Sequence, residues 1–361
     1  MKKLAVMTSG GDSPGMNAAL RAIAKLGAAE GVQVFGALEG YEGLIDGRFR
    51  ELTRRLPDGA VSVDLEVETA GGQGGTLIGS ARSLRFREKE GRRAAAEQLT
   101  RAGLEGLIVI GGNGSLTGAH VLAQEQGVKV MGIPGSIDND IGCTATALGV
   151  DTALNTIVEA CDRISDTARA HRRAFVVEVM GRDCGYLAMA SAVAMAADAV
   201  LIREQGKTEA QLVDDVASVV RTGMARGKRR ILIIKAEGIQ VPTTALVRLT
   251  EERMKAEAPG LEIRATVLGH VVRGGNPSYS DRAVAGRLGF GALNAMLGGA
   301  TDEMVGWMPP VEGGIATADS SVVRFPLQRV LDETRSLIDG SSPVTKRRLA
   351  LMGKASGVLA L

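Results

Sequence analysis

The sequence has little of what marks several large protein classes. Aromatic residues make up only 3% of the 361 residues, too few for the base-stacking surfaces of single-stranded nucleic-acid binders. The formal net charge is +2, so charge gives no general attraction to nucleic acid. No apolar run is long enough to span a bilayer. These absences give no argument for a nucleic-acid-binding or membrane-spanning protein.

Cysteine is also scarce. Cys143, Cys161 and Cys184 show neither the spacing of disulfide pairs nor that of metal ligands, which is typical of a reducing compartment. The first residues lead directly into a short apolar run that ends in Gly10-Gly11-Asp12, which does not fit a signal peptide. We therefore expect a cytoplasmic protein.

Glycine, by contrast, is abundant: 48 residues are scattered at the ends of apolar runs, as in turns. The apolar runs alternate with amphipathic segments, so we predict a doubly wound α/β fold with mainly parallel sheets. Ser13 followed by Pro14 predicts the N-cap and first residue of a helix over 14–30, and helical spacing predicts another over 146–170. The predicted strands are 3–8, 32–38, 106–111, 128–133, 173–179, 199–202, 229–235 and 262–268.

The length favours two domains. We expect a first α/β domain over 1–145 and about 273–313. The second would cover 146–272 together with a C-terminal segment over 314–361, where Val322–Leu327 and a following helix would complete it.

Three glycine-rich turns each close a short apolar run, at Thr8–Gly15, Gly111–Ser115 and Pro134–Asp140. The carboxyl ends of parallel strands share one edge of a sheet, where ligands collect. Glycine lets backbone N–H groups approach phosphate oxygens, and a helix N-terminus adds partial positive charge. One such turn is equally well explained as an ordinary strand-to-helix connection, but three in one domain indicate a polyphosphate site.

Asp138 and Asp140 are alternate carboxylates around Asn139. One could act as a base while the other holds a metal, and their like charges would raise one pKa. The alternative is simple turn chemistry, which these residue types favour. Beside Ser136 at a strand end, the functional interpretation is the stronger one, and it indicates phosphoryl transfer.

Charged residues at strand ends extend this site. Glu237 follows an apolar run and could accept hydrogen bonds from a sugar hydroxyl, and His270 is one of only three histidines, although a lone histidine is more often structural. Arginine at such positions suits bidentate phosphate binding, while most arginines are simply surface charges. The candidates are Arg82, Arg173, Arg182, Arg264 and Arg273.

A separate basic group contains Arg21 and Lys25, four residues apart on one helix face, with Arg54 and Lys228-Arg229-Arg230. It is either an exposed face or a second anion site, and both interpretations stay open.

Five segments match a known family in order and spacing: Thr8–Ala19, Gly79–Arg82, Pro134–Asp140, Val177–Arg182 and Arg264–Gly275. Through them the chain resembles the bacterial 6-phosphofructokinases over nearly its whole length. The resemblance implies two similar three-layer α/β/α domains, the first binding nucleotide and the second sugar phosphate, with the active site in the cleft between them. It also implies a Mg²⁺-dependent, allosteric glycolytic kinase, usually a homotetramer. Such a kinase moves a phosphate from ATP to the 1-hydroxyl of fructose 6-phosphate, giving fructose 1,6-bisphosphate and ADP.

The same resemblance implies individual roles. Asp138 would deprotonate the sugar, Arg182 would stabilise the transition state, and Ser136 takes the place of a threonine that touches the transferred group. Arg173 and Arg264 match residues that reach the sugar phosphate across a subunit interface, so each site would need two chains. The implied nucleotide residues are Gly11, Arg82, Ser83, Gly112, Asn113, Gly114 and Ser115. The metal residues would be Asn113 and Asp140. The other implied substrate residues are Ile137, Met180, Gly181, Glu237, His270 and Arg273.

Donor choice in this family follows side-chain size. Gly114 and Gly135 match ATP users, in which small residues leave room for the nucleoside part, whereas diphosphate users typically carry Asp and Lys there. We therefore expect ATP, with a diphosphate-dependent phosphotransferase as the alternative.

The chain also departs from the family. Asn113 stands where a metal-associated Asp is usual; this keeps an oxygen ligand but removes a charge, which should weaken Mg²⁺ binding. A regulatory paralogue of low activity is therefore a further alternative. Ser83 stands where many members have an aromatic residue near the adenine. Ser165 replaces an effector-site arginine and Asp198 stands at an acidic effector-metal position, while the basic character is kept at Arg21, Lys25, Arg54, Lys228, Arg229 and Arg230.

Overall fold

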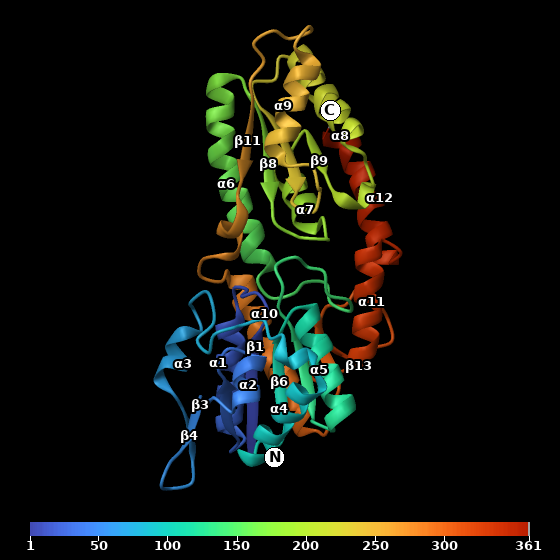
Figure 1. Ribbon diagram of the computed structural model, residues 1–361. Helices are drawn as coiled ribbons and strands as arrows, with labels where there is room; N and C mark the ends of the chain where they lie inside the picture. Colours follow the sequence, from blue (N-terminus) through green and yellow to red (C-terminus); the bar gives the residue numbers. More distant parts are fainter. Residues whose placement is uncertain (360–361) are drawn as a thin grey trace. The chain divides into compact units, whose positions relative to one another are not determined.

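The computed structural model describes residues 1–359 and confirms an α/β protein with mainly parallel sheets (Figure 1). The chain divides into two compact units. Unit 1 contains Met1–Ile137, Ile141–Thr152 and Arg273–Ser336. Unit 2 contains Asp138–Asp140, Ala153–Val272 and the chain from Leu337 onward.

Unit 1 is built on an eight-stranded sheet in the order β13-β14-β12-β7-β6-β1-β2-β3. The five inner strands β12, β7, β6, β1 and β2 run parallel, and the strands beyond them pair antiparallel. Their bounds are β1 Lys3–Ser9, β2 Gln33–Ala37, β3 Phe49–Glu51, β6 Leu107–Gly111, β7 Val130–Pro134, β12 Glu303–Trp307, β13 Ile315–Ala316 and β14 Val322–Pro326.

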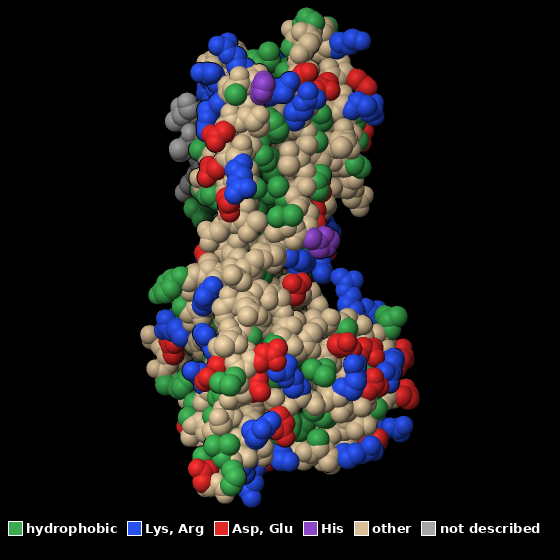
Figure 2. All heavy atoms as spheres, turned by 90° about the vertical axis from the view of Figure 1, so that its left-hand side faces the viewer, with side chains coloured by type: hydrophobic (Ala, Val, Ile, Leu, Met, Phe, Trp, Pro, Cys, Tyr) green, Lys and Arg blue, Asp and Glu red, His purple; other side chains and the backbone are tan. Residues whose placement is uncertain are grey.

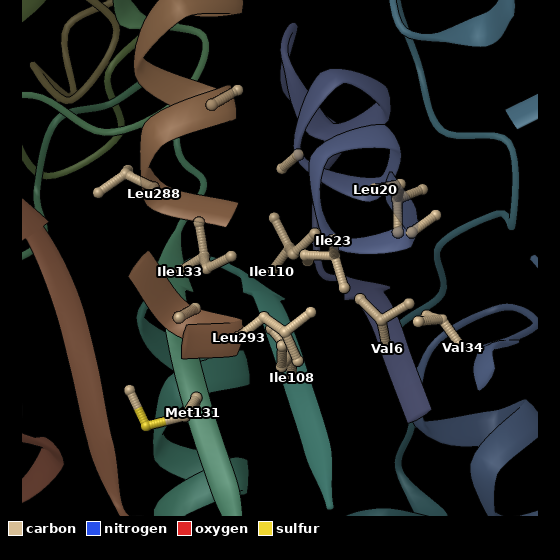
Figure 3. Close-up of a cluster of buried hydrophobic side chains, with 14 of the residues drawn as sticks. Val6, Leu20, Ile23, Val34, Ile108, Ile110, Met131, Ile133, Leu288 and Leu293 are labelled. Carbon is tan, nitrogen blue, oxygen red and sulfur yellow. The ribbon is translucent and has the colours of Figure 1, made fainter. Parts of the chain in front are cut away.

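The core of unit 1 follows from the two-residue period of these strands. Alternate apolar residues of β1, β6 and β7 point to one face, where they meet α1 (Met16–Ala29) and α10 (Tyr279–Leu297) (Figure 3). On the other face Gly132 faces α5 (Asn113–Gln126), where a Cβ would lie only 2.6 Å from Leu116. The packed side chains include Val6, Leu20, Ile23, Ile108, Ile110, Met131, Ile133, Leu288 and Leu293.

Smaller elements complete unit 1. They are α2 (Tyr41–Asp46), the β4–β5 hairpin (Thr53–Arg55 and Val61–Val63), α3 (Leu65–Ala70), η1 (Arg85–Arg87), α4 (Lys89–Arg101) and most of α11 (Leu327–Asp339).

Unit 2 is built on a fully parallel four-stranded sheet in the order β11-β8-β10-β9. Apolar residues of β8 and β10 form a core with α8 and α9. The strands are β8 Ala174–Val179, β9 Ala199–Leu201, β10 Ile231–Ala236 and β11 Ile263–Val267. The helices are α6 Val150–His171, α7 Tyr186–Ala194, η2 Arg203–Gln205, α8 Glu209–Ala225, α9 Thr243–Met254, η3 Gly269–Arg273 and α12 Pro343–Leu359.

Each of the eight predicted strands is present, with bounds within two residues of those expected. The predicted cap of the first helix is wrong. Helix α1 begins at Met16, and its N-cap is Gly15, which has φ +103° and provides no side-chain cap. Ser13 is fully buried instead of capping the helix. The second long helix starts at Val150, directly after Gly149 at φ +94°.

The C-terminal segment is divided differently from our expectation. Strand β14 does not complete the second domain but pairs antiparallel with β12 in unit 1, where Val322 joins the core. Unit 1 therefore holds the chain up to Ser336, and its earlier part extends to Thr152. The alternation of Val322–Leu327 predicts a strand but carries no information on which sheet it joins. Residues 360 and 361 of the expected segment lie outside the described residues.

Two surface properties agree with the composition. None of the helices within residues 1–359 combines the length and apolar character that crossing a membrane requires. Figure 2 shows Lys and Arg interspersed with Asp and Glu over the face in view, as expected for a net charge of +2.

Asp281 joins the start of α10 to the start of α6 within unit 1. Its carboxylate accepts hydrogen bonds from the backbone N of Gly149 at 2.9 Å and Thr152 at 2.8 Å, and from the Thr152 hydroxyl at 2.5 Å. The side chain is only 2% exposed, and burial raises the pKa of this carboxyl against the opposing effect of its donors.

We expect Asp281→Ala to lower the free energy of unfolding by about 2–4 kcal/mol, because three buried donors would lose their acceptor. The control is Asp214→Ala, which removes an exposed ion pair with Arg253 and should cost less than about 1 kcal/mol. Urea unfolding followed by circular dichroism measures both. Equal midpoints for the two variants would contradict this role of Asp281.

Candidate active site

The three glycine-rich turns meet at one edge of the unit 1 sheet. Strands β1, β6 and β7 are parallel neighbours, so their carboxyl ends adjoin. Gly135 N donates to Gly111 O at 2.9 Å, and a Cβ on Gly111 would lie 2.5 Å from Ser9 O. The absence of side chains therefore allows three backbone turns to approach one another closely.

The second turn opens directly into α5. Gly112 is the N-cap and provides no side-chain cap, so the first turn of the helix can present N–H groups to an anion. Gly114 is exposed, and no other atom lies within 4 Å of where its Cβ would be. Ser115 is buried, and Asn113 is half-buried at the start of the helix.

The first turn is held by the hydroxyl of Ser80 and the guanidinium of Arg273. Ser80 Oγ donates to Gly10 O at 2.6 Å, and Gly10 has φ +90°. Arg273 lies on this turn: its Nη1 donates to Asp12 O at 3.2 Å, and Nη1 is 3.0 Å from where a Cβ of Gly11 would be. Arg273, expected at the sugar, and Gly11, expected at the nucleotide, therefore lie side by side within unit 1.

The loop that carries Arg82 and Ser83 is held by two aromatic rings that the sequence analysis did not select. Tyr41 and Phe86 stack with centroids 3.7 Å apart, and the buried Tyr41 hydroxyl donates to Ser115 O at 2.6 Å. Ser83 Oγ accepts from Phe86 N at 3.0 Å, while Arg82 is exposed. Aromatic residues are rare in this chain, and that rarity is the one sequence signal that could have selected Tyr41 and Phe86.

Unit 2 contains the predicted acid and arginine. Asp138 is 2% exposed, and its Oδ2 lies 3.7 Å from Nε of the half-exposed Arg182. Arg182 has φ +46° and Asn139 has φ +51°. Non-glycine residues in this left-handed region are strained, and such strain clusters at functional sites. The geometry thus brings a buried carboxylate next to a guanidinium whose own residue has a left-handed backbone.

Glu237 holds the turn that carries Arg182. Its Oε1 accepts from Gly181 N at 3.1 Å and from Arg182 N at 2.8 Å. A Cβ on Gly181 would lie 2.4 Å from Cys184 O, and a Cβ on Gly238 would lie 2.0 Å from Arg182 O. Only glycine fits at both positions, so the turn is specified by two glycines and one carboxylate. Met180, just before it, is buried.

Arg173 and Arg264 lie together but far from this turn. Both pair with Glu262 Oε2, Arg173 at 2.5 Å and Arg264 at 2.9 Å. Arg173 precedes β8, whereas Met180 follows it, and at about 3.3 Å per residue the two ends of this strand are roughly 20 Å apart. One chain therefore does not bring these two arginines to its own Arg182. His270 is exposed in η3, after the carboxyl end of β11.

The second basic group is divided between the units. In unit 1, Arg21 packs over Gly71, Lys25 pairs with Glu68 at 3.5 Å, and Arg54 lies 3.9 Å from Glu51. In unit 2, Lys228 pairs with Asp198 at 2.6 Å, Arg229 is exposed, and Arg230 donates to Ala196 O at 2.9 Å and to Ser165 Oγ at 3.3 Å.

The predicted metal residues also fall in different units, Asn113 in unit 1 and Asp140 in unit 2. Within the described chain, no three His, Cys, Asp or Glu side chains are grouped as a metal site.

Known proteins resemble this chain over most of its length. Residues 3–296 match the family model described as phosphofructokinase. The ATP-dependent 6-phosphofructokinase of Thermotoga petrophila is 43% identical over 339 residues, covering 94% of this chain and 97% of the relative. That of Brevibacillus brevis is 45% identical over 306 residues, covering 85% and 89%.

Solved structures show the same fold. Phosphofructokinase from Saccharomyces cerevisiae aligns with a TM-score of 0.80 at 34% identity, over 99% of this chain. This chain spans 48% of the yeast chain, about half its length. The pyrophosphate-dependent phosphofructokinase from Marinobacter aquaeolei aligns with a TM-score of 0.74 at 18% identity, over 98% of this chain and 91% of the other, and shows the fold alone.

We expect Cys184, which lies in the turn after Arg182, to be unreactive at neutral pH. Burial, as the largest cause, raises the pKa of its thiol to about 12, so the nucleophilic thiolate is a minute fraction near pH 8. Iodoacetamide should therefore leave Cys184 unmodified in the folded protein at pH 8 and label it after unfolding in urea, as read by peptide mass spectrometry. Rapid labelling of the folded protein would contradict the burial of this thiol.

Proposed function

Because the chain belongs to the phosphofructokinase family, we propose that it transfers a phosphate from ATP to the 1-hydroxyl of fructose 6-phosphate, giving fructose 1,6-bisphosphate and ADP. One observation carries the proposal. The glycine turn at Pro134–Ser136 leads, two residues later, to a buried carboxylate that faces Arg182. A turn that we propose to bind phosphate thus continues directly into a candidate base.

In the proposed reaction Asp138 accepts the proton of the sugar 1-hydroxyl. The hydroxyl oxygen forms a bond to the γ-phosphorus, the bond from that phosphorus to the β-phosphate oxygen breaks, and ADP leaves with the electron pair. Arg182 supplies positive charge beside Asp138 and the transferring group. Its guanidinium is half-exposed, which leaves it accessible to a substrate.

The phosphates of the donor would lie on the unit 1 turns. The uncapped start of α5 at Gly112–Ser115 and the Gly10–Gly11 turn offer backbone N–H groups, and the exposed Arg82 adds charge. These groups bind oxygen anions without regard to the rest of the donor, so they do not by themselves choose between ATP and diphosphate.

The choice of ATP rests on Gly114 and Gly135. Space around the Cβ position of Gly114 is open, which leaves room for the nucleoside side of a donor. A Cβ on Gly135 would already lie 3.3 Å from Met16 Cε and 3.4 Å from Gly111 N, so a longer side chain would have to extend outward over the turn. The curated relatives at 43% and 45% identity are named ATP-dependent, which supports the same donor.

Mg²⁺ is the metal that such a reaction would use. The Asn113 amide and the Asp140 carboxylate offer oxygen donors of the kind that Mg²⁺ accepts, and this ion usually keeps waters and phosphate oxygens as its other ligands. Each is a donor that suits Mg²⁺, and Asn113 brings one negative charge fewer than an aspartate would at its position. When bound, the metal would offset phosphate charge.

Arg173 and Arg264 support a shared active site. Because they lie at the far end of β8 from Arg182, we propose that they bind the 6-phosphate of a sugar held by another copy of the chain, within a homotetramer. The basic group around Arg21 and Lys228 would serve an effector in such an assembly. The three free thiols support a cytoplasmic location.

The function is tested by measuring initial rates with fructose 6-phosphate and either MgATP or magnesium diphosphate, in parallel. We expect turnover with MgATP. Turnover only with diphosphate would overturn the donor assignment. An inactive chain that becomes active as Asn113→Asp would show that the native protein is a regulatory paralogue.

We expect Asp138→Ser to lower kcat by several orders of magnitude with only a modest change in fructose 6-phosphate affinity, because the base is lost while the sugar contacts remain. Steady-state kinetics and calorimetric titration of the sugar phosphate separate the two effects. Unchanged kcat would remove Asp138 as the base.

We expect Arg173→Ser and Arg264→Ser each to raise the half-saturating concentration of fructose 6-phosphate by about 10-fold or more, and that of ATP by less than about 2-fold. Each loses a phosphate contact but no nucleotide contact. Arg248→Ser, which removes an exposed ion pair with Glu252, is the control and should change neither value. An equal rise for both substrates would contradict the assignment.

A further inference from the structure

Lys235 is a buried charge that the proposed reaction does not use. It lies in β10 directly after the apolar run Ile231–Ile234 and is only 1% exposed. A buried lysine is expensive to desolvate unless its ammonium finds partners. Its partners therefore indicate what it does.

The first partner is an acid on the neighbouring strand. Lys235 and Glu178 are in register between β10 and β8, and Lys235 Nζ donates to Glu178 Oε2 at 2.9 Å. The Thr243 hydroxyl at the start of α9 donates to the same oxygen. These three side chains, the buried polar cluster, join β8, β10 and α9 at the carboxyl end of the unit 2 sheet.

The ammonium also faces the loop that leaves β10. Nζ lies 3.5 Å from Ala236 O and 3.4 Å from Ile239 O. Between these two carbonyls are Glu237, which accepts from Gly181 N and Arg182 N, and Gly238, on which a Cβ would lie 2.0 Å from Arg182 O. The position of this loop thus sets the position of the Arg182 backbone.

The acid of the cluster is linked to the other strand ends. Glu178 lies two residues before Met180, and its backbone carbonyl accepts from Leu268 N at 3.0 Å, just before η3 and His270. The cluster therefore lies immediately behind the strand ends that lead to Met180–Arg182, Glu237 and His270.

Stability alone does not explain the charge. The residues that precede the pair on the same face of β8 and β10 are apolar: Ala174, Val176, Ile231 and Ile233. A buried ion pair can often be replaced by apolar residues with little loss of stability. What an apolar pair cannot supply is an ammonium that holds two loop carbonyls and a carboxylate in one geometry.

We propose that Lys235 is a positioning residue for phosphoryl transfer: through Glu178 and the carbonyls of Ala236 and Ile239 it fixes the loop on which Glu237 and Arg182 depend. The inference rests on the proposed function. We expect disruption of the cluster to impair the use of fructose 6-phosphate but not the binding of ATP, because the hydrogen bonds of the cluster described above all lie in unit 2.

The test is the double variant Lys235→Met/Glu178→Met, which removes both charges and leaves neither unpaired. We expect a folded protein whose kcat/KM for fructose 6-phosphate falls about 30-fold or more, while the half-saturating ATP concentration changes less than about 2-fold. Calorimetric titration should show weaker binding of fructose 6-phosphate, a readout that does not need turnover. Wild-type kinetics in a folded double variant would overturn the proposal.

The matched control is Arg324→Met/Glu303→Met, which removes another cross-strand ion pair, 2.8 Å apart, between β14 and β12 of unit 1. It should keep wild-type kinetics, and an equal loss there would show a general effect of removing sheet ion pairs, contradicting the proposal.

One further variant and one further outcome complete the test. If the double variant does not fold, Thr243→Val removes one donor to Glu178, and we expect about a 3- to 10-fold loss in kcat/KM for the sugar phosphate. Wild-type values for this variant would then overturn the proposal. Absence of kinase activity in the wild-type chain is a different result, since it would reject the proposed function and leave the sugar-binding titration to test Lys235.

Discussion

Two hydrogen bonds to one carboxylate oxygen organise the candidate catalytic turn. Glu237 Oε1 accepts from the backbone of Gly181 and Arg182, and so holds Arg182 at a positive φ that the residue would not adopt in an open loop. The guanidinium is then within 3.7 Å of a buried Asp138. Gly181 and Gly238, which leave no room for a Cβ, define this turn together with the acceptor.

The two units differ in the chemical groups that they present at their strand ends. Unit 1 presents backbone groups, at places where Gly10, Gly111 and Gly135 let turns approach closely. Unit 2 presents side-chain charge instead: Arg182 lies beside Asp138, and Glu237 accepts from the Arg182 backbone. Backbone donors are fixed once the fold forms, whereas the side-chain set depends on a supporting layer such as the cluster around Lys235.

Much of this could be predicted from local patterns. Apolar runs that end in glycine located the strands, and parallel order placed their ends together. Other features depend on distant partners that no local pattern reveals. Gly15 rather than Ser13 caps α1, β14 joins the sheet of unit 1, and Arg273 lies on Gly11 from the far end of the chain. The role of Lys235 could not be predicted for the same reason. It follows four apolar residues in the sequence, and its partner Glu178 lies on another strand.

The ion pairs of Arg173 and Arg264 have a consequence for recognition. Both guanidinium groups share one carboxylate oxygen of Glu262, so the three side chains together keep one positive charge. In the proposed role, an incoming phosphate dianion would exchange places with a carboxylate of lower charge. Such a competition would favour dianions over monoanions, since a singly charged ligand brings the arginines no more negative charge than Glu262 already provides.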